Sequence, residues 1–357
     1  MDYVNKYDKL LEDVAESEYI SDLHLTVMNR PFVRVDGHLE PYEEYTEKLT
    51  GEEVNKIARN MMNEDQYEEF EEYGEVDFSY SVPGVSRFRV NAFHQRGSTG
   101  IALRIIPSEI PTIDSMNLPK VLKKLASQRM GLVLSTGPTG SGKSTTQAAI
   151  INEINNTRNA HVITLEDPIE YLHKHKQSLV HQREVGQDTS DFARGLRACL
   201  RQDPDVILVG EMRDLETIQI ALEAAETGHL VLATLHTNSA PATIDRIIDV
   251  FPPGQQDQIR IQLASVISGI IAQQLMPRKN ESGRVAAFEI MVATAAVRNI
   301  IREGKTSQLY SAIQTGGKLD MVTMDNYLLK LYNSGTISRE SVVHYCNDIK
   351  YIRERMM

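Results

Sequence analysis

The sequence predicts an α/β protein, in which a domain with a parallel-rich sheet is preceded by a smaller α+β domain. Three observations lead to this prediction. The chain has 357 residues, enough for two domains of ordinary size. Apolar residues make up 41% of it and charged residues 24%, a mixture that can bury sizeable cores. From residue 120, short apolar runs alternate with segments of helical periodicity, as expected when strands and helices alternate.

The smaller domain is expected to span residues 1–106. Its first 20 residues have apolar side chains at helical spacing, and a second helix is expected after Thr50, which forms a capping-box pattern with Glu53. Alternating apolar residues predict strands, which are expected at residues 23–27 and 32–35 and in the segments DFSYSV, SRFRVNAFHQ and TGIALRII.

Residues 107–119 are expected to be a hinge linker between the two domains. This stretch holds three prolines in thirteen residues. Because proline fixes φ and has no backbone N–H to donate, regular structure is expected to stop here.

The larger domain is expected to span residues 120–357. Four short apolar runs predict strands of a parallel sheet that is covered on both faces. These runs are GLVLST at 131–136, HVITLE at 161–166, DVILVG at 205–210 and HLVLATL at 229–235. The segments between them have helical periodicity, and the chain after about residue 255 is expected to be mostly helical.

The net charge of -11 is concentrated in the N-terminal part of the chain. Residues 1–75 carry 21 Asp and Glu against 7 Lys and Arg. This acidic excess argues against nucleic acid as a direct partner, because nucleic acid is bound mainly by basic surfaces.

The sequence has no run of about 18 uncharged apolar residues, so no transmembrane segment is expected. The acidic N-terminus does not match a secretory signal. The only cysteines are Cys199 and Cys346, which excludes a disulfide framework and a four-cysteine zinc site. A reducing cytoplasm fits this composition.

Residues 137–144 match the phosphate-loop pattern GxxxxGK[ST] in full, between a predicted strand and a predicted helix. Backbone N–H groups of such a loop surround phosphate oxygens, Lys143 is expected to reach the β- and γ-phosphates, and the Ser144 hydroxyl is expected to bind Mg²⁺. The residues expected to bind ATP here are Gly137, Pro138, Thr139, Gly140, Ser141, Gly142, Lys143, Ser144 and Thr145.

Polar side chains also follow the other predicted strands, at the edge where ligands of a parallel sheet bind. The second strand ends at Glu166 and the third at Glu211. No Asp stands at the usual Mg²⁺ position of the third strand, so Glu211 is expected on the Mg²⁺ side and Glu166 is expected to polarise the attacking water. The reverse assignment also fits, because sequence order gives no distances.

Two histidines flank the fourth strand. His236 follows it, at the functional edge, and is expected to sense the γ-phosphate. His229 precedes this strand and is also a candidate for nucleotide binding. Packing in the core or at an interface explains His229 equally well.

Positive charge on the γ-phosphate often comes from an arginine of a neighbouring subunit. Four arginines lie in the strand region of the smaller domain, namely Arg87, Arg89, Arg96 and Arg104. Arg87 and Arg89 alternate with apolar residues and therefore share one face of their strand. The alternative for each of them is an ordinary charge on a strand surface.

Together these motifs resemble those of the secretion ATPases of type IV pilus and type II secretion systems, and most closely the pilus retraction ATPases among them. The resemblance extends over nearly the whole chain. It includes SDLHL, RVDGHL, VPGVSRFRVNAF and LRIIP in the smaller domain, and GPTGSGKS, ITLEDPIE, RQDPDVILVGEMRD and AETGHLVLATLHT in the larger one. It implies a RecA-like P-loop NTPase domain preceded by a PAS-like N-terminal domain.

The resemblance also implies an activity and a set of partners. Such proteins hydrolyse ATP with Mg²⁺ as hexameric rings, in which Arg89 and Arg104 match the positions that reach the nucleotide. Glu166 matches the glutamate that activates water, Glu211 the Walker B glutamate, and His236 a histidine near phosphate. A cytoplasmic motor, peripheral at the inner face of the cell membrane, is then expected to act on a pilus platform protein and to power retraction and twitching motility.

The alternatives to a retraction motor are other ATPases of the same family, a GTPase switch and a nucleic-acid translocase. Pilus extension and type II secretion ATPases usually carry an extra N-terminal domain and often a four-cysteine zinc insert, neither of which is seen here. Residues 296–303, AVRNIIRE, resemble an element of the retraction ATPases, although on periodicity alone they form an amphipathic helix. A GTPase switch lacks its DxxG motif, and a nucleic-acid translocase is disfavoured by the acidic smaller domain.

Overall fold

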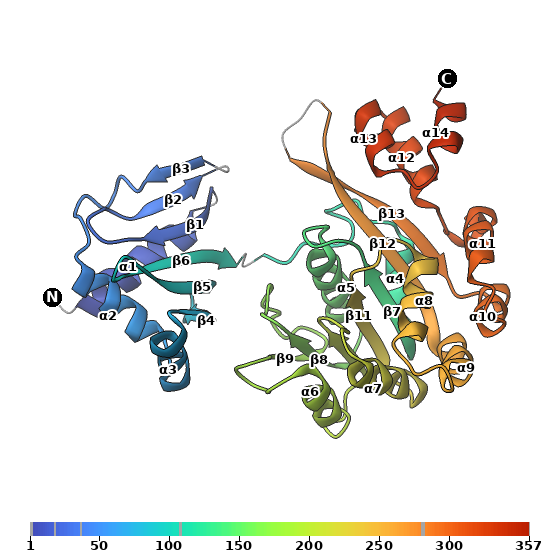
Figure 1. Ribbon diagram of the computed structural model, residues 1–357, viewed down its shortest axis with the longest axis horizontal. Helices are drawn as coiled ribbons and strands as arrows, with labels where there is room; N and C mark the ends of the chain where they lie inside the picture. Colours follow the sequence, from blue (N-terminus) through green and yellow to red (C-terminus); the bar gives the residue numbers. More distant parts are fainter. Residues whose placement is uncertain (1–2, 18, 36–37, 107–108, 280–282, 357) are drawn as a thin grey trace. The chain divides into compact units, whose positions relative to one another are not determined.

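The computed structural model describes residues 3–17, 19–35, 38–106, 109–279 and 283–356 (Figure 1). They form two compact units. The first unit comprises Met1–Glu109 together with Pro168–Leu172, and the second comprises Ile110–Asp167 together with His173–Met357.

The first unit is an α+β structure with one antiparallel sheet, whose strand order is β3-β2-β1-β6-β5-β4. Its elements are α1 (Tyr3–Glu16), β1 (Ile20–Leu25), β2 (Phe32–Val35), β3 (His38–Pro41), α2 (Gly51–Met61), α3 (Glu64–Tyr73), β4 (Glu75–Val82), β5 (Ser86–Gln95) and β6 (Ser98–Ile106). The predicted capping box is present, since the Thr50 side chain accepts from the Glu53 N–H and the Glu53 carboxylate accepts from the Thr50 N–H.

One face of this sheet packs against the three helices and forms the core of the first unit. Phe88 and Val90 of β5 are fully buried there, whereas Arg89 between them is exposed on the other face. Two elements were not predicted. The short β3 contains Pro41 and three exposed residues, and α3 is strongly acidic, so neither has the apolar periodicity from which elements are recognised.

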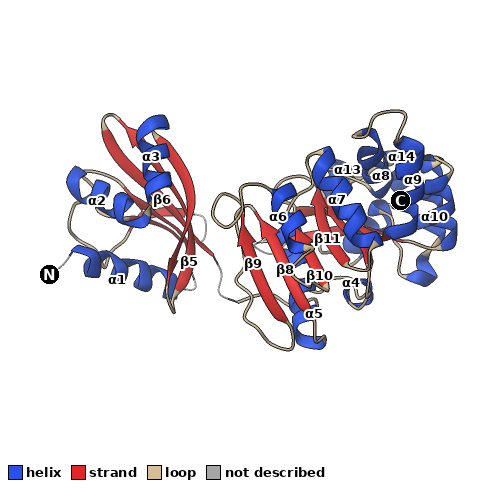
Figure 2. Ribbon diagram, turned by 90° about the horizontal axis from the view of Figure 1, so that it is seen from below, coloured by secondary structure: helices blue, strands red, loops and turns tan. Residues whose placement is uncertain are grey.

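The second unit is built on one sheet with the strand order β13-β12-β7-β11-β10-β8-β9, flanked by helices (Figure 2). Every neighbouring pair is parallel except β12 and β13. Its strands are β7 (Gly131–Thr136), β8 (His161–Glu166), β9 (Leu179–Glu184), β10 (Val206–Val209), β11 (Leu230–Leu235), β12 (Ile267–Pro277) and β13 (Arg284–Val292). Its helices are α4 (Val121–Ala126), α5 (Lys143–Thr157), α6 (Phe192–Cys199), α7 (Leu215–Glu226), α8 (Ala240–Asp249), α9 (Gln256–Val266), α10 (Ala295–Arg302), α11 (Leu309–Thr315), α12 (Met324–Asn333), α13 (Arg339–Tyr345) and α14 (Ile349–Arg355).

Both faces of this sheet are buried, which explains why its strands are apolar throughout. Leu132 and Leu134 of β7 point into a core shared with α6 to α11, and Val133 between them points into a second core shared with α4 and α5. A third cluster joins α12 to α14 to the distal parts of β12 and β13.

The expectation of a mostly helical chain after residue 255 is wrong for Ile267–Pro277 and Arg284–Val292, which form β12 and β13. Both strands have long buried runs, and a buried strand cannot be distinguished from a buried helix by its apolar residues alone. The polar edge strand β9 was also missed.

The boundaries of the two expected domains, at residues 106 and 120, remain a prediction. Residues 107–108 of the expected linker lie outside the described part of the chain. Ile113 and Leu118 are buried in the core of the second unit, so residues 110–119 belong structurally to that unit. Across the described ranges, the structure contains no helix long and apolar enough to span a membrane.

Candidate functional site

The phosphate loop connects β7 to α5 and turns through backbone conformations that favour glycine. Gly137, Gly140 and Gly142 have φ values of 146°, 77° and 88°. A Cβ at Gly137 would lie 2.2 Å from the backbone oxygen of Gln273 on β12, so no larger residue fits there. The loop is therefore a tight cradle of backbone groups at the N-terminus of α5, where the helix dipole favours an anion.

Lys143 begins α5 and is buried against the loop that precedes it. Its Nζ donates to the backbone oxygens of Gly137 at 2.8 Å and Pro138 at 3.1 Å. The hydroxyls of Thr136 and Ser141 are also buried, and neither has a hydrogen-bond partner among the described residues. Buried polar groups without partners are rare in proteins, so this cradle fits a polar ligand such as the phosphates of ATP.

Glu166, at the end of β8, is held by two neighbouring side chains. The Thr164 hydroxyl donates to Glu166 Oε1 at 2.6 Å, and the Gln182 amide donates to the same oxygen at 3.1 Å. Gln182 lies on the edge strand β9, which the sequence did not reveal as a strand. These hydrogen bonds fix the position of the carboxylate.

Glu211 follows β10, forms an ion pair with Arg213 and contacts His236, and its side chain is only 17% exposed. Arg213 Nη2 lies 2.7 Å from Oε2, and His236 Nε2 lies 3.0 Å from Oε1. Burial alone would raise the pKa of Glu211, but the hydrogen bonds and charges of Arg213 and His236 outweigh it and lower the pKa. The carboxylate is therefore ionised at neutral pH.

Gly210 explains how the ends of β8 and β10 come close together. Its N–H donates to the Leu165 carbonyl at 2.7 Å, and a Cβ at this position would lie 3.0 Å from that oxygen and 3.3 Å from the Glu166 Cα. An Asp in the place of Gly210 would crowd the end of β8. The carboxylate that follows β10 therefore stands one position later, at Glu211.

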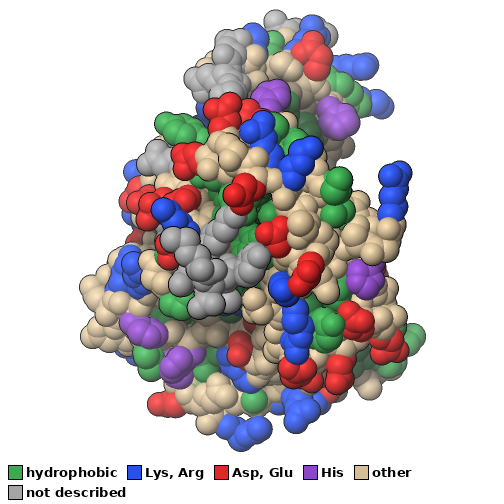
Figure 3. All heavy atoms as spheres, turned by 90° about the vertical axis from the view of Figure 1, so that its left-hand side faces the viewer, with side chains coloured by type: hydrophobic (Ala, Val, Ile, Leu, Met, Phe, Trp, Pro, Cys, Tyr) green, Lys and Arg blue, Asp and Glu red, His purple; other side chains and the backbone are tan. Residues whose placement is uncertain are grey.

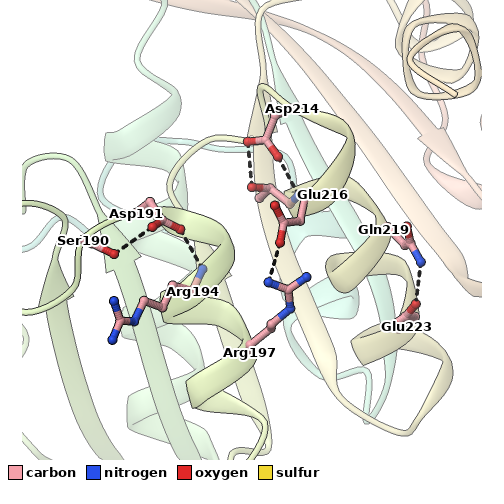
Figure 4. Close-up of polar contacts among 9 residues, drawn as sticks. Ser190, Asp191, Arg194, Arg197, Asp214, Glu216, Gln219 and Glu223 are labelled. Atoms are coloured by element: carbon pink, nitrogen blue, oxygen red, sulfur yellow. Dashed lines mark hydrogen bonds and ion pairs between the residues drawn. The ribbon is translucent and has the colours of Figure 1, made fainter.

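Two other acids near these strand ends have structural roles. Asp214 caps α7 by accepting from the Thr217 N–H and hydroxyl, each at 2.8 Å, as Figure 4 shows. Asp191 caps α6 in the same way through the Arg194 N–H. An ion pair between Arg197 and Glu216 then joins these two helices.

The two histidines that flank β11 lie at opposite ends of that strand. His236 contacts Glu211 at the edge where the phosphate loop begins. At the other end, the Nδ1 atom of His229 lies 2.9 Å from the Ala224 oxygen and 3.3 Å from the Thr227 hydroxyl. Within one chain, the structure does not bring His229 to the phosphate loop.

Arg89 and Arg104 face each other on neighbouring strands of the first unit, β5 and β6. The same transverse row of the sheet continues through Asp22 on β1 to Arg34 on β2. Arg104 Nε lies 2.9 Å from Asp22 Oδ1, and Arg34 Nε lies 3.8 Å from Oδ2. Arg89, Arg104 and Arg34 thus lie in one transverse row on the same face of the sheet, and the sequence alone did not identify Arg34.

The described residues contain no group of three or more His, Cys, Asp or Glu side chains that could hold a metal ion. Oxygen donors suited to Mg²⁺ are present, however. The Ser144 hydroxyl is exposed in the first turn of α5, and the ionised Glu211 carboxylate ends β10. A hydroxyl and a carboxylate, completed by water and phosphate oxygens, fit the preference of Mg²⁺.

The chain is similar to proteins of one known family. The model of the family "Type II/IV secretion system protein" matches residues 4–337. The chain is 51% identical over 321 residues to the "Type IV pilus retractation ATPase PilT" of Pseudomonas aeruginosa, which covers 90% of this chain and 92% of that protein. It is 47% identical over 311 residues to the "Twitching motility protein" of Neisseria gonorrhoeae, covering 87% and 83%.

The structure is also similar to a solved one, described as the crystal structure of the pilus retraction motor PilT with bound ADP. The two superpose with a TM-score of 0.90 at 48% sequence identity, over 97% of this chain and 98% of that one.

Proposed function

Because this chain belongs to the type II/IV secretion system protein family, we propose that it is an ATP-hydrolysing ring motor that powers the retraction of type IV pili. The observation that carries the proposal is the match to a pilus retraction ATPase over nine-tenths of both chains. A phosphate loop with buried polar groups, beside two ordered carboxylates, supports the ATPase activity.

We assign the nucleotide-binding roles to the loop at residues 137–145, with Lys143 on the β- and γ-phosphates. Ser144 and Glu211 would hold Mg²⁺, which when bound neutralises charge on the phosphate oxygens. Glu166 would orient and polarise the attacking water, since the Thr164 hydroxyl and the Gln182 amide hold its carboxylate in place, whereas Glu211 is paired with Arg213 and lies beside His236. His236 would link the γ-phosphate to Glu211.

We further propose that the active site is completed between subunits of a hexameric ring. Arg89 and Arg104 would reach the nucleotide of a neighbouring chain and stabilise charge on its γ-phosphate. Their exposure on a sheet face is what such a contact requires. His229 would contact nucleotide only across a subunit boundary, because it lies away from its own phosphate loop.

The proposed motor works in the cytoplasm, at the inner face of the cell membrane, on the platform protein of the pilus machine. ATP binding and hydrolysis would change the arrangement of the two units. The expected linker at residues 107–119 would supply the hinge in its first part, because residues 110–119 pack with the second unit. Such a change does work only if nucleotide binds one arrangement better than the other.

A secretion or pilus extension ATPase of the same family is the alternative. The AVRNIIRE segment lies in α10, where Val297 and Ile301 are buried, so core packing explains its apolar face and the segment does not decide between the two. A nucleic-acid translocase has less support. The face shown in Figure 3 carries Asp and Glu interspersed with Lys and Arg and offers no continuous basic surface.

Two experiments test the proposal. Specific ATPase activity, measured across protein concentrations, should rise steeply and then reach a plateau if subunits complete each other's sites. Activity that stays constant down to monomeric protein would contradict the ring. Retraction is tested by expressing this chain in a piliated bacterium that lacks its retraction ATPase. Restored twitching supports the assignment, whereas restored pilus assembly in an extension mutant would favour the alternative.

A further inference from the structure

One side chain that lies far from the phosphate loop in the sequence contacts it in the structure, Gln273 of β12. Strands β12 and β7 are parallel neighbours (Figure 1), and Ala272 pairs with Thr136, the last residue of β7. Gln273 therefore lies beside the point where the loop begins. It is only 3% exposed, so its amide must find partners inside the protein.

Both ends of the Gln273 amide are bonded to the loop and its helix. Nε2 donates to the Ser141 carbonyl at 2.7 Å, and Oε1 accepts from the Thr146 hydroxyl at 2.7 Å. Thr146 belongs to the first turns of α5, and its N–H donates to Gly142 at 3.0 Å. One buried amide thus joins the last part of the loop to the helix that follows it.

The backbone of the loop also fits closely around Gln273. A Cβ at Gly142 would lie 2.8 Å from Gln273 Nε2. The loop thus meets the backbone of this residue at Gly137 and its side chain at Gly142. Glycine at these two places permits both the turn and the contact with β12.

The hydrogen bond to Ser141 has a consequence for the next N–H group. In a planar trans peptide, the C=O and the following N–H point in opposite directions. Because the Ser141 carbonyl points toward Gln273, the Gly142 N–H points away from β12. Phosphate loops bind phosphate through such N–H groups. The direction of this donor is therefore set by a residue outside the motif.

We propose that Gln273 is a positioning residue for nucleotide binding, which orients the 141–142 peptide so that its N–H faces the phosphates. This inference rests on the proposed ATP-binding role of the loop. Gln273 itself touches no phosphate; it acts through Ser141 and Thr146.

The test uses the full chain with two substitutions, each measured with a fluorescent ADP analogue and Mg²⁺. Gln273→Met keeps the length of the side chain but can neither donate to Ser141 nor accept from Thr146. Gln273→Glu can still accept from Thr146 but, when ionised, cannot donate to Ser141. We expect both to bind the analogue at least about tenfold more weakly than the wild type. The buried Ser141 carbonyl loses its donor in both variants, so another orientation of the 141–142 peptide becomes favoured.

The neighbouring Gln274→Met is the matched control. Gln274 has the same side chain on the same strand, but successive strand residues point to opposite faces, so it points away from the loop. This variant should bind the analogue with the wild-type dissociation constant.

Thermal unfolding separates positioning from a merely structural role. We expect the rise in melting temperature caused by nucleotide to shrink in the Gln273 variants. Wild-type affinity in a folded Gln273→Met overturns the inference. A Gln273 variant with a lower melting temperature but an unchanged rise on adding nucleotide also overturns it. If Gln273→Met does not fold, the affinity of Gln273→Glu alone tests the inference. If the wild type itself binds no nucleotide, the proposed function fails instead.

Discussion

The two units position their charged residues in different ways. In the second unit, Glu166, Glu211, His236 and the phosphate loop come from the ends of neighbouring parallel strands, and each glutamate already has partners within the chain. In the first unit, Arg89 and Arg104 are aligned by antiparallel register. The Arg104 side chain remains 69% exposed although it pairs with Asp22. Buried charges need internal partners, whereas exposed arginines can act on another surface.

The largest expected effect tests the second unit alone. Lys143→Ala removes the cation that we propose reaches the β- and γ-phosphates, so ATP turnover should fall by at least about a hundredfold in a steady-state phosphate-release assay. The exposed Lys174→Ala in the same unit is the control and should retain activity. Full activity in a folded Lys143→Ala protein would refute the site assignment.

The next largest effect tests whether Arg104 of the first unit completes the active site of a neighbouring subunit. Arg104→Ala should lower turnover by about a hundredfold or more, as expected for an arginine that stabilises the transferred phosphate. Mixing it with the inactive Lys143→Ala protein should restore part of the activity, because mixed rings contain some sites with both an intact loop and an intact arginine. If mixtures that demonstrably exchange subunits recover no ATPase activity, Arg104 acts in the site of its own chain.

A third prediction separates the two carboxylates. Glu166→Gln should lower kcat by about a hundredfold while leaving ADP binding nearly unchanged, because the proposed role of Glu166 is to act on water and not on the nucleotide. Gln182→Ala should lower kcat by about tenfold, since it removes one of the donors that hold Glu166. Equal loss of nucleotide affinity in both variants would instead assign Glu166 to binding.

A smaller effect is expected in the pH dependence. The pKa of Glu211 is lowered in the folded protein, so the carboxylate is fully charged above its ordinary pKa and loses its charge only as the pH falls through the lower folded value. Arg213→Ala removes one of the groups that lower this pKa. The acid limb of kcat/KM should therefore move to higher pH, while Arg213→Lys should keep it closer to the wild-type position.

The smallest effect on turnover is expected at Asp214, an acid in the same strand-end region. Asp214→Ala removes a helix cap and should destabilise the second unit by about 1 kcal/mol, seen in thermal unfolding, with turnover at 25 °C almost unchanged. Asp214→Asn retains an acceptor and should be close to wild type. A large loss of turnover in Asp214→Ala would show that strand-end position alone predicts catalytic function.

These differences also explain what the sequence could predict. The alternating apolar runs and the glycine-rich motif are local, so the strands β7, β8, β10 and β11 and the phosphate loop were predicted within a residue or two. The resemblance to secretion ATPases is confirmed by the family match. The roles of individual site residues remain predictions.

Features that depend on distant pairing were not predictable in this way. Gln182 reaches Glu166 only because β9 pairs with β8, and Arg34 joins the arginine row only through the register of β1 with β2. Register between strands is fixed by packing of the whole sheet, which a single sequence does not display. Gln273 likewise reaches the phosphate loop only because β12 pairs with β7.

The strand order of the second unit has a consequence for the newly synthesised chain. Strand β7 lies between β11 and β12, both of which are made long after it. At about 5–20 residues per second, a ribosome that has completed the phosphate loop needs several more seconds, up to roughly half a minute, before Gln273 emerges. During that interval the loop lacks its neighbours, so the nascent chain should begin to bind nucleotide only near the end of translation.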